Sequence, residues 1–308
     1  MSVLVVGLGI QGKKRSALLG SLVVGSVDPV NDEADYSKLE DAPVGEFRDV
    51  FLCVPDGAKA TLINQALNAG KNILIEKPLL LPEIESFVEL ENRANALGCI
   101  IYTAYNHRFE PHFIEVKKHL DAKTIGKIYQ VGMFYGNGTA KLVANSPWRD
   151  SGSGVISDLL PHLLDTLNYW FDSKDFICEH AVQRTFETIS PDYARIQGVL
   201  GEIHVDLEMT LCSWRNTFRL TIVGEKGSMH IDSLCKWGPS TFVIRNRIFP
   251  SGKPHESSKV IEQKDPTWNA EHASFFEKIK GHKKTDLSVD AWIQETLDKI
   301  SRNMGGHI

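Results

Sequence analysis

The chain has 308 residues, of which 42% are hydrophobic and 24% are charged, and its formal net charge is -5. This composition is typical of a folded globular protein and excludes disordered and fibrous classes, while the length predicts two domains. Acidic and basic residues are interspersed without a basic stripe, so we expect no nucleic-acid partner.

The five cysteines are widely spaced and form no C-x-x-C pair. They indicate neither a disulfide framework nor a zinc cluster, and the histidines also lack ligand spacing, so we expect no metal and reduced thiols in a cytoplasmic protein. The apolar start of the chain is too short for a membrane span and has no basic flank. We therefore expect a buried strand there, with neither an export signal nor a membrane partner.

Strands and helices are predicted to alternate through the first third of the chain. The expected strands are Val3–Val6, 22–27, 50–54, 72–75 and 99–103, and the expected helices are 13–19, 58–69 and 82–97. Runs rich in β-branched residues and leucine are typical of parallel strands that are buried on both faces. The segment between Asp28 and Val50 contains Pro29, Pro43 and many acids, so we expect a short or irregular crossover.

After about residue 104 the pattern changes to strands with alternating polarity. Residues 203–209 alternate polar and apolar side chains, which predicts a strand with one face on a core. Residues 218–223 and 229–231 flank a Gly224-Glu225-Lys226-Gly227 turn and predict a hairpin. Helical patterns at 271–280 and 290–302 are compatible with packing on either domain. An α+β domain with a largely antiparallel open sheet follows, at residues 105–308.

A glycine-rich loop, Gly7-Leu8-Gly9-Ile10-Gln11-Gly12, directly follows the first predicted strand and precedes a helix. In this spacing the first glycine allows a sharp turn, the second lets the backbone approach a pyrophosphate, and the third lets helix and strand pack closely. The helix N-terminus also favours negative charge. We therefore predict a Rossmann domain at residues 1–104 that binds a dinucleotide through Gly7, Gly9, Ile10, Gln11 and Gly12.

Asp28 ends the second predicted strand, 21 residues after Gly7. A carboxylate at this place accepts hydrogen bonds from the ribose hydroxyls and repels a 2′-phosphate, so Asp28 predicts NAD as the cofactor, with NADP less favoured. The alternative is that Asp28 only ends a strand in a turn. Lys13, Lys14 and Arg15 in the following helix receive no function from the sequence.

A Glu76-Lys77-Pro78 triplet ends the predicted strand at 72–75, and ligands bind at this end of parallel strands. Together with the glycine loop and Cys53-Val54-Pro55, the triplet makes nearly the whole chain resemble the glucose-fructose oxidoreductase and inositol dehydrogenase (Gfo/Idh/MocA) family. The resemblance implies that Lys77 is the catalytic lysine beside the nicotinamide, that Pro78 is cis, and that Pro55 and Glu76 bind the cofactor. An ammonium there would stabilise negative charge developing on a hydroxyl oxygen. The alternative for Lys77, and the usual one for a lysine outside such a motif, is a solvated surface charge.

The second half contains Gly152-Ser153-Gly154 followed by Asp158, His162 and Asp165. This matches the family's glycine run and D-x-x-x-H-x-x-D pattern, with Ser153 in place of the middle glycine. On a helix these three residues share one side. We expect Ser157 or Asp158 to cap that helix and Pro161 to lie in its first turn.

The resemblance implies that His162 exchanges a proton with the substrate hydroxyl and that Asp158 positions the reacting groups. An imidazole pKa of about 6.5 suits that task. The alternative is a helix cap and a packed helix residue. The family also implies a cofactor contact from Arg149, and Tyr105, His107 and Tyr135 are further candidates to face the pocket. The implied substrate contacts are Asn106, Arg108, Trp148 and Asp165. For Asn106 and Arg108, salt bridging between the domains is the alternative.

These residues predict an NAD-dependent oxidoreductase acting on CH-OH groups, which transfers a hydride between nicotinamide and a hydroxyl-bearing carbon of a sugar, cyclitol or nucleotide-sugar. This reaction requires that Lys77 and His162 both reach the same substrate molecule. One alternative is a lyase or glycosidase that retains NAD and cycles it internally. Another is a non-catalytic dinucleotide-binding regulator, which predicts a damaged lysine or histidine. Relatives associate through the open sheet face, so we expect a homodimer or homotetramer.

Overall fold

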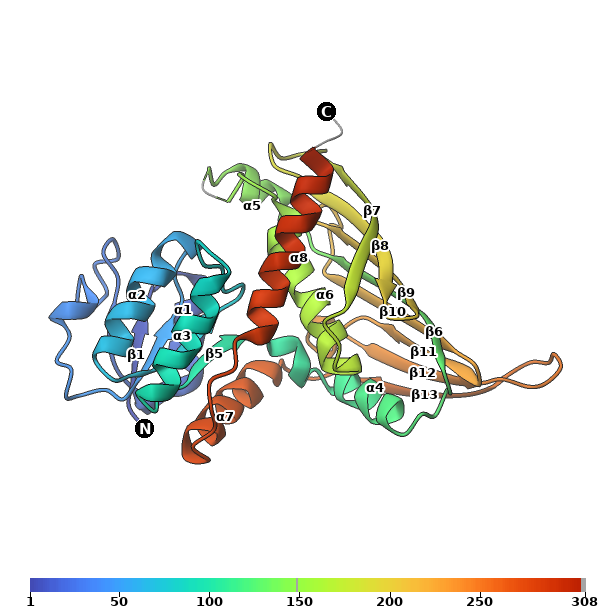
Figure 1. Cartoon of the computed structure of the whole chain (residues 1–308), viewed down its shortest axis with the longest axis horizontal. Coiled ribbons are helices and arrows are strands. Elements are labelled where there is room, and N and C mark those ends of the chain that lie inside the picture. The colour runs from blue at the N-terminus through green and yellow to red at the C-terminus, as the bar shows by residue number, and fades with distance from the viewer. Residues whose placement is uncertain (148, 306–308) are drawn as a thin grey trace. The chain divides into compact units, whose positions relative to one another are not determined.

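The computed structural model describes residues 1–147 and 149–305, which form two compact units (Figure 1). Met1–Asn106 and Thr267–Gln294 make up the first unit. The second contains His107–Pro266 and the chain from Glu295 onward. The sequence-based division after residue 104 assigned the whole C-terminal part to the second domain, whereas residues 267–294 pack with the first unit.

The first unit contains a five-stranded parallel sheet in the order β2-β1-β3-β4-β5, which confirms the predicted Rossmann-like fold class. Its strands are β1 (Val3–Val6), β2 (Val23–Val27), β3 (Asp49–Leu52), β4 (Asn72–Glu76) and β5 (Ile101–Ala104). Its helices are α1 (Ile10–Leu19), α2 (Asp56–Asn68), α3 (Glu85–Ala96) and α7 (Thr267–Lys280). The predicted strands and helices are therefore present, with ends that differ by a few residues.

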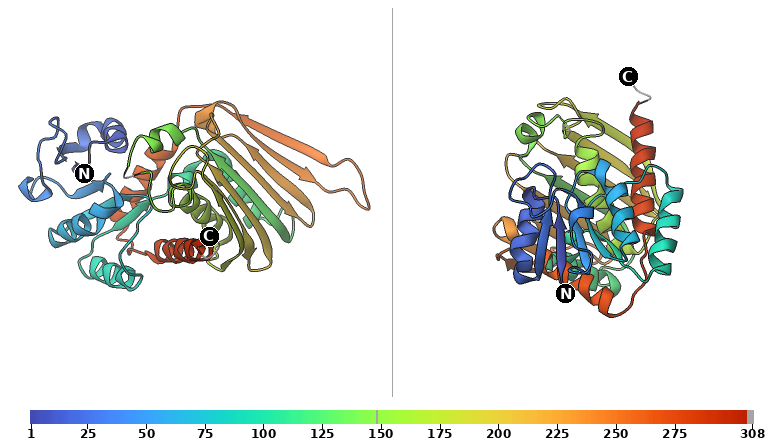
Figure 2. Two further views of the ribbon diagram at one scale, coloured as in Figure 1. Left: turned by 90° about the horizontal axis from the view of Figure 1, so that it is seen from above. Right: turned by 90° about the vertical axis from the view of Figure 1, so that its left-hand side faces the viewer.

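Two hydrophobic cores cover the two faces of this sheet. On one face, residues such as Leu4 and Ile75 pack with Ile63 of α2 and Phe87 of α3. On the other face, Phe51 and its neighbours pack with Leu19 of α1 and with Phe275 and Phe276 of α7. Figure 2 shows helices on both sides of the strands. The aromatic side chains of α7 give this helix its place in the first unit, because they bury apolar area against the sheet.

The connection from β2 to β3 is irregular, as the sequence predicted, and it contains no α-helix. It holds only a 3-10 turn at Leu39–Asp41 and an isolated bridge between Val27 and Tyr36. Leu39, Ala42 and Phe47 of this crossover pack in the core on the face that α2 and α3 cover. On the other face, α7 packs together with α1.

The second unit contains an eight-stranded sheet in the order β13-β12-β11-β10-β6-β9-β8-β7. Only the β6–β9 pair is parallel among its ladders in the described chain, so the largely antiparallel sheet is confirmed. The predicted hairpin is β10–β11, with Glu225 and Lys226 at its turn. The strands are β6 (Ile128–Gly136), β7 (Phe176–Arg184), β8 (Tyr193–Leu200), β9 (Ile203–Thr210), β10 (Thr217–Gly224), β11 (Gly227–Asp232), β12 (Ser240–Asn246) and β13 (His255–Ile261).

Helices pack on one face of this sheet. Helix α6 (Val155–Phe171) lies against β8 and β9, and α4 (Pro111–Asp121) packs on α6. The ring of Phe113 on α4 meets both Trp170 of α6 and Phe218 of β10, which joins these layers. The short helix α5 (Ala140–Ala144) precedes α6, and α8 (Ser288–Gly305) ends the described chain.

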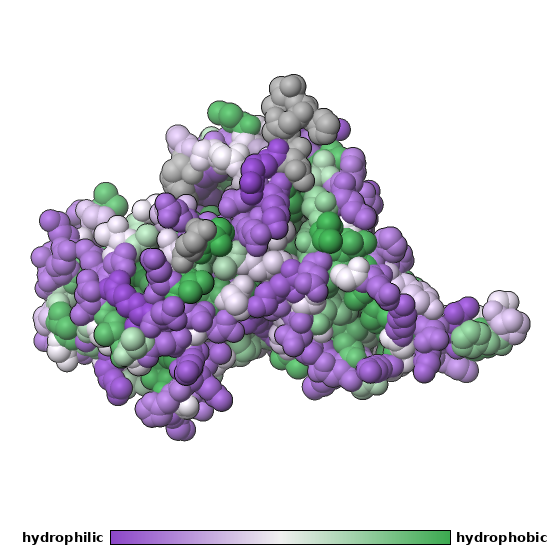
Figure 3. Space-filling view, viewed as in Figure 1, coloured by the Kyte–Doolittle hydropathy of each residue, from purple (hydrophilic) through white to green (hydrophobic). Residues whose placement is uncertain are grey.

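The molecular surface mixes hydrophilic side chains with scattered hydrophobic ones on the face shown in Figure 3. Among the described residues, no helix has the length and apolar character needed to span a bilayer.

Candidate active site

The glycine loop leaves room for a ligand at its second glycine. Gly7 has a φ of 92°, and a Cβ on Gly12 would lie 1.8 Å from the carbonyl oxygen of Gly7, so both positions require glycine. A Cβ on Gly9 would meet nothing within 4 Å. Helix α1 begins at Ile10, inside the motif and earlier than predicted, with exposed side chains at Ile10 and Gln11. The loop is therefore a backbone cradle at a helix N-terminus, which fits a dinucleotide pyrophosphate.

Asp28 lies beside this cradle and organises the loop after β2. Its carboxylate accepts hydrogen bonds from the backbone nitrogens of Leu8 at 2.8 Å and of Val30 and Asn31 at 3.0 Å. Partial burial raises the pKa of Asp28, but the three donors outweigh burial and hold this pKa below its ordinary value. A shallow depression of about 650 Å³ next to Asp28 is lined by Leu8, Gly9, Lys13, Asp28 and residues 30–33.

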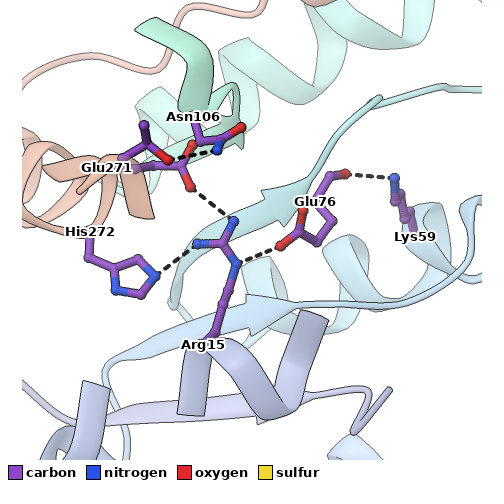
Figure 4. Close-up of polar contacts among 7 residues, drawn as sticks. Arg15, Lys59, Glu76, Asn106, Glu271 and His272 are labelled. Atoms are coloured by element: carbon purple, nitrogen blue, oxygen red, sulfur yellow. Dashed lines mark hydrogen bonds and ion pairs between the residues drawn. The ribbon is translucent and has the colours of Figure 1, made fainter. Parts of the chain in front are cut away.

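Arg15 connects α1 with the triplet at the end of β4 and with α7 (Figure 4). Its guanidinium donates to Glu76 Oε1 at 2.6 Å and to Glu271 Oε2 at 2.9 Å, and it lies 2.8 Å from His272 Nε2. Burial lowers the pKa of Arg15, but attraction by Glu76 and Glu271 outweighs it and raises this pKa. Burial, and then the charge of Arg15, lowers the pKa of His272 to about 3.

The three basic residues of α1, which the sequence left without a function, thus all have partners. Lys13 pairs with Glu33, Lys14 lies 3.8 Å from the ring centre of Trp268, and Arg15 is buried in the network described above. The carboxylate of Glu76 is engaged by Arg15, so a role for Glu76 in cofactor binding remains a prediction.

Lys59, which the sequence did not single out, contacts the backbone of the Glu76-Lys77-Pro78 triplet. Its side chain is 1% exposed, and its ammonium donates to the carbonyl oxygens of Glu76 and Pro78 at 2.6 Å and 2.5 Å. The Lys77–Pro78 peptide between these carbonyls is cis, as the family resemblance implied. Burial and the nearby charge of Lys77 lower the pKa of Lys59, although Asp56 opposes them. The spacing of Lys59 from Ile63 and Ala66 places it on the apolar face of α2, and this signal was available in the sequence.

Asp158 and His162 both lie on α6, as predicted, but the helix begins earlier than expected. It starts at Val155 after Gly154, where no side-chain cap is present, so the expected cap at Ser157 or Asp158 and the first-turn position of Pro161 were wrong. The hydroxyl of Ser157 instead donates to the carbonyl of Gly154 at 3.0 Å. Gly154 has a φ of 49°, and a Cβ there would lie 2.2 Å from the carbonyl oxygen of Pro191. Close backbone packing therefore sets the start of α6.

His162 is buried among aromatic rings of the second unit. The His107 ring stacks on it with centroids 4.3 Å apart, and Tyr135 meets it edge-on at 5.8 Å. Tyr135 also lies 5.9 Å from Trp237. Burial, and then the charge of Asp158, raises the pKa of Tyr135. Two of the three additional candidates, His107 and Tyr135, thus lie next to His162.

The remaining residues predicted to contact the cofactor or the substrate make different contacts. Arg108 donates to both carboxylate oxygens of the fully buried Asp165, whose pKa is raised by burial against the opposing effect of Arg108. Asn106 donates to Thr267 Oγ1 at 2.8 Å. Arg149 is half-buried in a turn before α6, and Trp148 lies outside the described residues. Pro55 is exposed at the start of α2, and Tyr105 donates to Asp290.

No group of histidine, cysteine or acidic side chains in the described chain has the arrangement of a metal site. The polar groups gather instead at the glycine loop, at the end of β4 and on α6. These are residue types that hold a dinucleotide, donate to a hydroxyl oxygen and exchange a proton, respectively.

Two family models match the chain. An oxidoreductase family model with an NAD-binding Rossmann fold matches residues 1–105, and a GFO/IDH/MocA C-terminal domain model matches residues 113–230. The chain is 26% identical to scyllo-inositol 2-dehydrogenase (NAD(+)) of Bacillus subtilis over 212 residues, which cover 66% of this chain and 59% of that protein. Matches to three other curated oxidoreductases span 42% to 62% of the length of those proteins.

Two solved structures share the fold over nearly the full length. Levoglucosan dehydrogenase in complex with NADH superposes with a TM-score of 0.83 at 18% identity, covering 99% of this chain and 97% of that one. UDP-N-acetylglucosamine 3-dehydrogenase GnnA from Acidithiobacillus ferrooxidans gives a TM-score of 0.80 at 17% identity, covering 98% and 96%. With both of its parts matched by models of one family, the chain belongs to the Gfo/Idh/MocA oxidoreductases.

Proposed function

We propose that the protein is an NAD-dependent dehydrogenase acting on a CH-OH group of a sugar, cyclitol or nucleotide-sugar. One observation carries the proposal: the first unit holds both an open glycine cradle at Gly9 and a Glu-Lys-Pro triplet at the carboxyl end of β4. In an open parallel sheet, ligands bind at the carboxyl ends of the strands. NAD, when bound, supplies the hydride acceptor or donor.

In this proposal Lys77 donates a hydrogen bond to the reacting hydroxyl oxygen, and its charge stabilises the developing negative charge. His162 takes up or returns the hydroxyl proton, and Asp158 positions the reacting groups. The buried rings of His107 and Tyr135 restrict the rotation of the His162 imidazole. Arg108, held by Asp165, contacts substrate hydroxyls with Asn106 and Trp148, while Pro55, Glu76 and Arg149 contact the cofactor.

NAD is the preferred cofactor in this proposal, over NADP. The depression beside the cradle is lined by the acidic residues Asp28, Asp32 and Glu33, and its one lysine, Lys13, is paired with Glu33. Because the Asp28 pKa is held low, its charge would repel a 2′-phosphate at neutral pH.

We further propose a cytoplasmic homodimer or homotetramer. Support for the compartment comes from the five cysteines, which are all free thiols. Support for association comes from the face of the second sheet opposite α6, where a depression of about 470 Å³ is lined by strands β6 to β10. Light scattering of the purified protein measures the assembly directly.

A substrate panel with two alanine variants tests the proposed activity. Inositols, levoglucosan and UDP-N-acetylglucosamine are assayed with NAD and NADP, with NADH absorbance as the signal. We expect Lys77→Ala and His162→Ala to lose turnover while they still bind NADH. Net NADH accumulation rules out a purely internal redox cycle. Normal turnover in either variant would contradict the assigned roles.

A further inference from the structure

A buried lysine contacts the backbone on both sides of the proposed catalytic lysine. The Lys59 ammonium donates to the carbonyl oxygens of Glu76 and Pro78, and its third acceptor is Asp56 Oδ1 at 2.6 Å. A buried ammonium costs free energy unless hydrogen-bond acceptors surround it, and all three acceptors here are close. The two backbone contacts therefore lie on the residues immediately before and after Lys77.

On the β3 side of β4 the ladder stops before Glu76, although Glu76 still pairs with Ala104 of β5 on the other side. The ladder between β3 and β4 ends at the Leu52–Ile75 pair, so Glu76 lies beyond its last pair on that side. The chain leaves β3 and turns into α2, and the carbonyl oxygen of Glu76 accepts from Lys59 of that helix instead of from a continued β3. The lysine therefore replaces a missing part of the ladder.

We propose that Lys59 is a positioning residue that holds the backbone around Lys77 and so sets the place of the Lys77 ammonium. This inference rests on the proposed function, in which Lys77 is the catalytic residue. Arg15 completes the arrangement because it holds the Glu76 side chain at 2.6 Å (Figure 4). The Glu-Lys-Pro triplet is thereby bound at its first side chain and at the carbonyls of its first and third residues.

The chain contains a matched control at the other end of the same strand. Lys71, which directly precedes β4, is also buried, and its ammonium donates to the carbonyls of Val44 and Phe47 at 2.5 Å and 2.6 Å. Lys71→Met and Lys59→Met remove the same chemical group from the same kind of site. Only Lys59 borders the triplet.

The test combines hydrogen–deuterium exchange of the protein without cofactor, NADH affinity by fluorescence, and kcat and KM for whichever panel compound turns over. We expect Lys59→Met to speed amide exchange in residues 76–81 and to lower kcat about tenfold to a hundredfold, with NADH affinity nearly unchanged. Lys71→Met should lose stability yet keep the wild-type kcat and the wild-type exchange in residues 76–81.

An unchanged kcat in Lys59→Met, or an equal loss in Lys71→Met, would overturn the inference. If Lys59→Met does not fold, Asp56→Asn replaces it, because Asp56 is half-exposed and its loss weakens the hold on Lys59. Smaller changes in the same directions are then expected, and their absence overturns the inference. A wild-type protein without NAD-dependent turnover refutes the proposed function, whereas the exchange comparison separately decides whether Lys59 holds the segment.

Discussion

The buried pair of Arg15 and His272 makes the stability of the first unit depend on pH. Arginine can only donate, so His272 Nε2 must accept the hydrogen bond and its ring proton must lie on Nδ1. Burial and the charge of Arg15 lower the pKa of His272 from 6.5 to about 3. The folded protein therefore keeps this ring neutral in a pH range where the unfolded chain protonates it.

The sign and size of the effect follow from linkage. Because the folded pKa is below the unfolded one, the unfolded state binds more protons between these two values, and stability falls as the pH falls through this window. Between pH 7 and pH 5 the loss amounts to about 2 kcal/mol. This value changes little if the folded pKa is one unit higher, because the unfolded-state protonation dominates it.

Urea unfolding of wild type and His272→Gln at pH 7 and pH 5 measures this loss. The glutamine amide oxygen can accept from Arg15 but does not titrate, so the variant should lose about 2 kcal/mol less than wild type over this range. Phe275→Leu, in the same helix, is the control, since it weakens the core without removing a titratable group. Equal pH dependence in wild type and His272→Gln would refute the reasoning.

Three further predictions concern the cofactor site and the second unit. Gly12→Ala should destabilise the first unit by about 3 kcal/mol, because its Cβ meets backbone, whereas Gly9→Ala should keep the wild-type melting temperature and lose NADH affinity in a fluorescence titration. Asp28→Ser should raise the ratio of kcat/KM for NADP over NAD by roughly tenfold to a hundredfold, and an unchanged ratio would remove Asp28 from cofactor selection. Arg108→Leu leaves the Asp165 carboxylate buried and unpaired, so denaturant unfolding should show a loss of about 3 kcal/mol, which Asp165→Asn in the same chain should partly restore.

Local patterns in the sequence predicted the fold and part of the site. The apolar runs of Val3–Val6 and residues 50–54 identified buried strands, and the spacing of Asp158 and His162 placed both on one helix. These predictions succeeded because burial periodicity and glycine conformation depend on near neighbours in the chain. The start of α6 was misplaced, because a contact between Gly154 and the distant Pro191 sets it.

By itself, the sequence determined a parallel sheet with a glycine cradle, an acidic residue at Asp28, a lysine at a strand end and a histidine on a helix. The tertiary structure alone decided which buried charges surround these residues. Arg15 meets Glu271 and His272 across more than 250 residues of chain, and Lys59 reaches the triplet from α2, the helix that precedes β4. Such pairings depend on which helix covers which face of the sheet. The aromatic side chains of α7 place this helix on the same face as α1, because they pack in the core there.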